Sequence, residues 1–189
     1  QRTRNTPSSA ARGITLAETT GRSLQQLSLA PGYIEREWTE NGRRCFHYVM
    51  DKHILAFYAT LSARYKVHKE NYKGTSLEIY YDPQHEFSLP SMIQASQDGL
   101  DYYGTHFSPY LYRQFRIIEF PRYQGFAQAF PNTIPFSAGI GFLYRPSKTD
   151  DKVDLAYFVT AHDQAPQCWA PQAIGGKGRG AAKVCGGRG

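Results

Sequence analysis

The sequence of 189 residues has no long uninterrupted apolar run, and its beginning, QRTRNTPSSAARG, has no hydrophobic stretch. A membrane-spanning helix needs about 20 mostly apolar residues, and a signal peptide needs a shorter apolar core. These residues therefore predict neither. Because the first residue is Gln, we expect the chain to be cut from a longer protein, with any membrane segment or export signal outside it.

Cysteine is also scarce, since Cys45, Cys168 and Cys185 are odd in number and far apart. Disulfide frameworks and cysteine-rich zinc sites need even or closely spaced cysteines. We therefore expect free thiols. Composition nevertheless allows a folded domain, because 41% of the residues are hydrophobic and 14% are aromatic, which is enough apolar material for a core.

Acidic residues are absent after Asp163, whereas residues 175–189 are rich in glycine and carry four cations: Lys177, Arg179, Lys183 and Arg188. These four account for most of the formal net charge of +6. The rest of the chain is close to balanced, so we expect no nucleic-acid partner for it. The aromatic and basic residues between 102 and 116 are better explained as core and rim than as a stacking surface.

The first part of the chain predicts β-structure. Residues 1–30 show little periodicity and predict an irregular lead-in, with one strand near residues 13–19. Residues 44–50, 54–69 and 75–81 are rich in Tyr, Phe, Ile and Val and are bounded by turn residues. This pattern predicts three long antiparallel strands.

The pattern changes after residue 83. Apolar residues at helical spacing predict a helix that begins at Pro90 and ends near Gly104. Residues 114–120 predict a buried strand, and a short strand is expected around residues 140–144. The next helix is expected from Val153 onward. The fold class predicted from this order is α+β.

The segment from Val153, VDLAYFVTAHDQAPQCW, has the frame of a zinc-peptidase helix. A helix with H-E-x-x-H places two imidazoles on one face, where both reach one zinc ion, with the Glu beside them as general base. Here the frame holds His162, Asp163 and Pro166. The first ligand remains, the base is one methylene shorter, and proline has no atom that binds metal. An interior proline also weakens a helix.

Several separate segments share a wider resemblance, in the right order: residues 29–51, 57–67, 107–123, 126–142 and 153–162. They resemble the aminopeptidase N type of zinc metallopeptidase, a thermolysin-like gluzincin family. The similarity is greatest to the peptidase module of bacterial proteins that join it to an ABC-transporter permease-like membrane part. A covalent link to such a part in the full-length protein is therefore expected.

The resemblance implies a domain plan. Residues 31–83 would be the end of an N-terminal antiparallel β domain, and residues 84–174 would begin a thermolysin-like α/β catalytic domain. Residues 175–189 do not continue the family, and their glycine-rich, basic composition predicts a disordered tail. In the family a second helix there carries a Glu as third zinc ligand, but this sequence has no carboxylate after Asp163.

The resemblance also implies a site. His162 matches the first ligand of Zn²⁺, the family's cofactor, and Asp163 holds the position of the general base. Ala138 falls where the family has a Glu that binds the free amino group of the substrate. Asn132 and Ser137 belong to the segment that forms the edge of the cleft. One imidazole cannot hold zinc alone, so zinc binding is not expected from the chain as written.

The function expected is that of a fragment of a zinc aminopeptidase, which hydrolyses N-terminal residues of peptides through zinc-activated water and is inactive in this form. The alternative is a non-catalytic peptide-binding or scaffold module derived from the same family. A third hypothesis takes GKGRG and GGRG as an RNA-binding tail. The departures from the motif fit either a decaying gene or a frame-shifted reading of an intact one.

Overall fold

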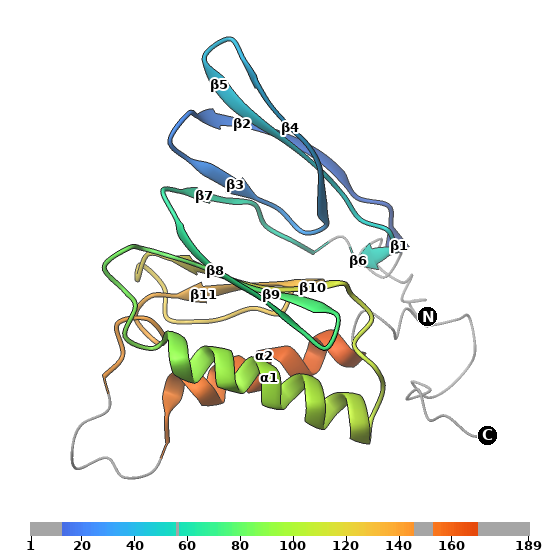
Figure 1. The fold of residues 1–189 in the computed structure, drawn as a ribbon, viewed down its shortest axis with the longest axis vertical. Coiled ribbons are helices and arrows are strands. Elements are labelled where there is room, and N and C mark those ends of the chain that lie inside the picture. The colour runs from blue at the N-terminus through green and yellow to red at the C-terminus, as the bar shows by residue number, and fades with distance from the viewer. Residues whose placement is uncertain (1–12, 56, 146–152, 170–189) are drawn as a thin grey trace, which may run out of the picture.

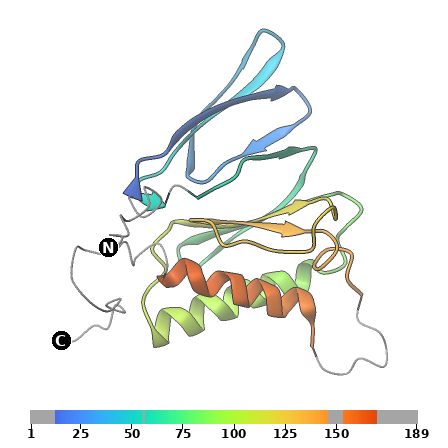
Figure 2. The same ribbon diagram turned by 180° about the vertical axis from the view of Figure 1, so that it is seen from behind.

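The computed structural model describes residues 13–55, 57–145 and 153–169. Two helices cover one face of a four-stranded sheet, and smaller sheets from the first part of the chain lie beyond the other face (Figures 1 and 2). The mixed α+β class predicted from the sequence is confirmed. No helix among the described residues is long and apolar enough to span a membrane.

The first part of the chain forms three small antiparallel sheets, with the orders β2-β5-β4, β3-β7 and β1-β6. Their strands are β1 (Gly13–Ile14), β2 (Ala17–Ser23), β3 (Leu27–Leu29), β4 (Tyr33–Glu40), β5 (Arg43–Val49), β6 (Ile54–Leu55) and β7 (Leu61–Ala63).

Two expectations for this part need correction. The lead-in expected to be mostly irregular contains β1, β2 and β3: the strand expected near residues 13–19 covers β1 and only the start of β2, and β3 was not predicted. The single strand expected over residues 54–69 is three strands, β6, β7 and the start of β8, because each pairs with a different partner. Their partners are β1, β3 and β9.

The larger sheet has the order β11-β10-β9-β8. It consists of β8 (Lys66–Tyr72), β9 (Thr75–Tyr81), β10 (Gln114–Phe120) and β11 (Thr133–Ser137). A tight turn with positive φ at Lys73 and Gly74 joins the antiparallel pair β8 and β9. The pairs β9–β10 and β10–β11 are parallel. All seven residues of β10 are buried, which confirms the buried strand predicted there.

The strand expected around residues 140–144 is wrong, because those residues form turns and the chain ends this sheet with β11 instead. The strand β11 was not predicted because it contains Pro135. Proline lacks the N–H that a central strand needs, but β11 is the last strand of its sheet, where this loss is tolerated.

The helices α1 (Leu89–His106) and α2 (Leu155–Trp169) pack side by side on the sheet (Figure 1). Both were predicted. Pro90 lies in the first turn of α1, where its missing N–H costs no helical hydrogen bond because the first N–H groups of a helix have no partner within it. Met92 of α1 and Ala156 of α2 join a core whose other buried members come mainly from the sheet: Leu77, Ile79, Tyr81, Phe115, Ile117, Ile134 and Phe136.

The smaller sheets are attached to the larger sheet by the turn between β3 and β4. Arg116 of β10 donates to the Ala30 carbonyl at 3.0 Å, and Gln114 donates to the Gly32 carbonyl at 3.1 Å. Asn132 accepts the Gly32 N–H at 3.3 Å. The boundary expected after residue 83 divides β9 from α1, yet β8 and β9 share one sheet and one core with β10 and β11.

Candidate functional site

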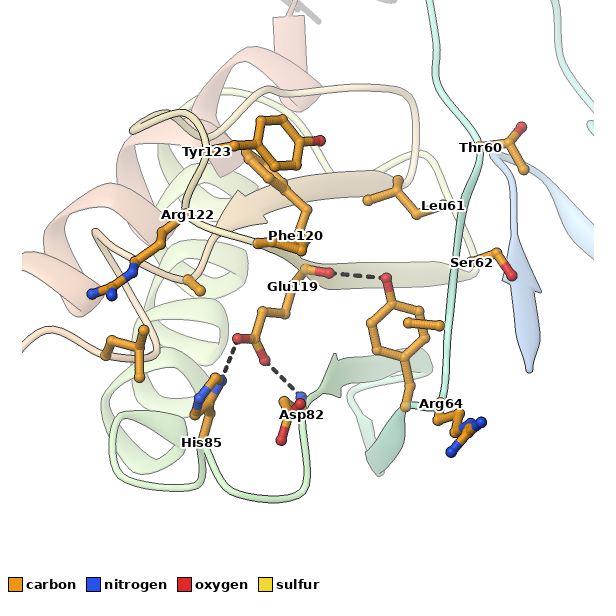
Figure 3. A pocket seen from close by; sticks show the side chains of 15 residues that line it. Thr60, Leu61, Ser62, Arg64, Asp82, His85, Glu119, Phe120, Arg122 and Tyr123 are labelled. Atoms are coloured by element: carbon orange, nitrogen blue, oxygen red, sulfur yellow. Dashed lines mark hydrogen bonds and ion pairs between the residues drawn. The ribbon is translucent and has the colours of Figure 1, made fainter. Parts of the chain in front are cut away.

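A cavity of about 590 Å³ opens at the carboxyl ends of the three parallel strands (Figure 3). The strands β9, β10 and β11 end at Tyr81, Phe120 and Ser137, and the residues that follow them, Asp82, Pro121 and Ala138, all line the cavity. Crevices at the carboxyl ends of parallel strands are common ligand sites in α/β sheets. The segment of residues 60–65, which includes β7, forms another wall.

The polar end of the cavity is built around Glu119, near the end of β10 (Figure 3). Its carboxylate accepts the backbone N–H of Asp82 at 2.6 Å and contacts Nδ1 of His85 at 2.5 Å. Its own carbonyl accepts the hydroxyl of Tyr65 at 2.9 Å. Two chain segments, residues 82–85 and the segment of Tyr65, therefore hold Glu119 in one position.

Burial raises the pKa of Glu119 above its ordinary value of 4.5, although the bonds from Asp82 and His85 act in the opposite direction. Only 6% of the Glu119 side chain is exposed. Burial likewise raises the pKa of Tyr65, so its hydroxyl stays protonated and donates to Glu119. The carboxylate is thus desolvated, a condition found at many functional sites.

The apolar part of the cavity is lined by Leu61, Phe120, Ala138 and Leu143. Pockets of this volume, with mostly apolar walls and a few fixed polar groups, have the size and composition that suit small organic ligands or short peptide segments. The arrangement can hold an apolar group beside one oriented carboxylate.

The structure separates the residues expected in the cleft. Ala138 lines the cavity. Ser137 is fully buried, donates to the Gln124 carbonyl and accepts the Gly139 N–H at 3.3 Å. Asn132 is also fully buried, has a positive φ of 51°, and bonds to Gly32 at the junction between the sheets. Of the three, Ala138 alone is a lining residue of this cavity.

His162 and Asp163 lie elsewhere, on α2, and neither lines the cavity. The His162 side chain is 66% exposed, and its Nδ1 lies 2.8 Å from Oδ1 of Asp163. Asp163 is buried, and its other oxygen has no hydrogen-bond partner within the described part of the chain. The two residues, which the resemblance places at the positions of first ligand and general base, therefore pair with each other.

The donors present on α2 do not fit zinc. Zinc sites of this type use three protein ligands around one open position. Among residues 13–55, 57–145 and 153–169, no three His, Cys, Asp or Glu side chains are placed to hold a metal ion. The helix continues through Pro166 to Trp169, so the proline does not end it, but it supplies no donor.

Sequence reasoning did not single out Glu119 or His85. The signal for Glu119 was present, because a charged residue in a strand that reads as wholly buried must find a partner or a function. His85 follows Pro83 in an irregular segment. Nothing in its local sequence indicates that the fold brings it against β10.

Comparison with protein-family models gives no match, and no curated protein matches the chain significantly. The tail expected to be disordered lies outside the described residues.

Proposed function

We propose that this chain belongs to the aminopeptidase N type of zinc metallopeptidase and that, in the form described, it binds peptides without hydrolysing them. The order of elements supports this descent. A mixed sheet with one helix before β10 and a second helix bearing the degenerate motif is the arrangement expected at the start of a thermolysin-like domain.

The observation that carries the binding function is the cavity at the strand ends. It contains Ala138, the position at which the resemblance places the substrate's amino anchor, and it joins that position to apolar walls and a fixed carboxylate. A peptide segment needs both kinds of contact, because apolar walls supply affinity and oriented polar groups supply register.

The absence of hydrolysis is argued from the donor set. Zinc lowers the pKa of its water to about 7 only when protein ligands hold it beside a general base. His162 is directed to Asp163, and Asp163 is both shorter than Glu and buried. Position 166 has no donor atom. No reaction step through zinc follows from these residues.

Binding and hydrolysis should be measured on the same purified chain. We expect saturable binding of a short peptide with an apolar first residue and a C-terminal fluorophore, read by fluorescence anisotropy. We expect no hydrolysis of leucine anilide, with or without added zinc. Turnover that requires one zinc per chain would overturn the non-catalytic assignment, and lack of any peptide binding would overturn the binding function.

A matched pair of variants locates the binding site. Leu143 is a partly exposed residue of the cavity lining, whereas Leu24 is an exposed leucine in the turn between β2 and β3. Leu143→Asp places a charge in the apolar wall and should weaken peptide binding about tenfold or more. Leu24→Asp should leave binding unchanged.

A further inference from the structure

Two arginines line the cavity at the strand ends, Arg64 and Arg122. Arg64 lies between β7 and β8, and Arg122 follows β10, so the two come from different walls. Figure 3 shows them on opposite sides of Glu119. Both are exposed, and neither forms an ion pair with an acid in the part of the chain that the structure describes. The rim of the cavity therefore carries two unpaired positive charges.

The acids of the same cavity do not balance these charges, because each is held by other groups. Glu119 accepts the backbone N–H of Asp82 and contacts His85. The Asp82 carboxylate accepts the N–H of Gln84 at 2.9 Å. Apart from burial, the main groups that shift the pKa of Glu119 are Asp82 and His85, and neither arginine is among them. Both guanidinium groups thus stay available to a ligand.

We propose that the peptide bound in this cavity carries acidic side chains, whose carboxylates pair with Arg64 and Arg122. This inference rests on the proposed peptide-binding function and names the class of peptide. A guanidinium group presents its N–H donors in a planar fork that matches the two oxygens of a carboxylate. The apolar walls at Leu61, Phe120 and Leu143 receive an apolar side chain. The preferred peptide then has an apolar residue followed by acidic ones.

An isolated small anion is a poorer candidate for these arginines. Both are exposed, and an ion pair between exposed groups is weak because each partner keeps much of its hydration. A peptide whose apolar residue already occupies the cavity brings its carboxylates to the rim without a second loss of translational freedom. The arginines therefore select among peptides, whereas the apolar walls supply most of the affinity.

The test compares two peptides of the same shape on the wild-type chain, Leu-Glu-Glu-Ala and Leu-Gln-Gln-Ala, each with a C-terminal fluorophore. At about 0.01 M salt we expect the glutamate peptide to bind roughly fivefold more tightly, the upper range for one exposed ion pair. At about 1 M salt, where the screening length falls to about 3 Å, the difference should disappear. Equal binding at low salt would overturn this inference and leave the peptide-binding function standing. If neither peptide binds, both proposals fail.

Two double variants then assign the preference to the rim of the cavity. Arg64→Gln with Arg122→Gln should bring the glutamate peptide to the level of the glutamine peptide. Arg36→Gln with Arg43→Gln is the matched control, because it removes the same charge from exposed arginines of β4 and β5 that do not line the cavity. The control should keep the preference. An equal loss in both variants would overturn the inference, since net charge alone would explain it. So would a preference that persists in the cavity variant with a melting temperature like that of the wild type.

Discussion

The buried pair of Arg116 and Glu78 gives the strongest stability prediction. The Arg116 Nε lies 3.2 Å from the carboxylate of Glu78, and the two side chains are 3% and 4% exposed. Arg116 also donates to the Ala30 carbonyl and lies over the rings of Tyr48 and Tyr80. It therefore joins the small sheets to the large one, and Arg116→Met removes this link while it keeps much of the side-chain volume.

The magnitude follows from what the substitution leaves behind. Removal of one partner from a buried ion pair costs about 3–5 kcal/mol, and the orphaned Ala30 carbonyl adds about 1 kcal/mol. Lys69 reduces this loss, because its Nζ lies 2.7 Å from Glu78, although its side chain is 63% exposed. We expect a net loss of about 3 kcal/mol, which lowers the melting temperature by roughly 10 °C for a chain of this size.

The assay is urea unfolding of a double-mutant cycle with Glu78→Gln. Arg116→Met together with Glu78→Gln should be more stable than Arg116→Met alone, since the uncompensated charge is gone. Additive losses in the cycle, or an Arg116→Met variant as stable as the wild type, would refute the reasoning.

The pH dependence of this pair provides an independent check. Burial alone would raise the pKa of Glu78, but Arg116 and Lys69 outweigh it and the pKa lies below 4.5. A lowered carboxyl pKa contributes stability above the unfolded value, and this contribution disappears as the pH falls through the folded value. The difference in unfolding free energy between wild type and Arg116→Met should therefore shrink on acidification below about pH 4.5. A difference that stays constant would contradict the charge pairing.

Two further stability predictions concern the helices. A Cβ at Gly99 would lie 2.1 Å from Oε1 of buried Gln164, so Gly99→Ala should destabilise the chain by about 1–3 kcal/mol in urea unfolding. Gly104 is on the same helix, and a Cβ there would have no neighbour within 4 Å, so Gly104→Ala should stabilise the chain by up to about 1 kcal/mol. Equal effects of the two substitutions would refute the close approach at Gly99. Pro166→Ala restores an N–H for the carbonyl of His162 and should raise the melting temperature, with a gain of up to about 3 kcal/mol; an unchanged value would mean that the helix already accommodates the proline.

The sequence predicted those elements whose local pattern agrees with their final environment. The helix α1 was found from helical spacing and its first-turn proline, α2 from the frame of the segment that begins at Val153, and β10 from its wholly buried pattern. The elements that were predicted wrongly are those whose structure is set by a tertiary contact. Residues 54–69 have a continuous β pattern but divide among three partners, and Pro135 suits only a strand at the sheet edge.

The candidate site was less predictable for the same reason. Ala138 could be placed beside a cavity from the resemblance, but the cavity's carboxylate comes from a strand that looks purely structural in sequence. His85 and Glu119 are 34 residues apart, and a parallel sheet with a helical crossover brings them together. No local pattern records such a contact, because the crossover through α1 sets it.

The polar residues of α2 and Glu119 of the cavity differ in their burial and in their effect on the stability of the fold. On α2 the buried Thr160, Gln164 and Gln167 lie on the helix face turned away from solvent, and Asp163 is buried as well, whereas the His162 side chain is exposed. Glu119 differs from these residues because its burial is linked to a raised pKa. Its raised pKa means that the folded state binds the proton more tightly, so the stability it contributes below the unfolded pKa is lost as the pH rises through the folded value. Ionisation of Glu119 thus costs folding free energy relative to its protonated form. A buried carboxyl group with this property that also lines a cavity is a candidate ligand-binding group. The proposed peptide binding therefore depends on the strand ends and needs no ligand from α2.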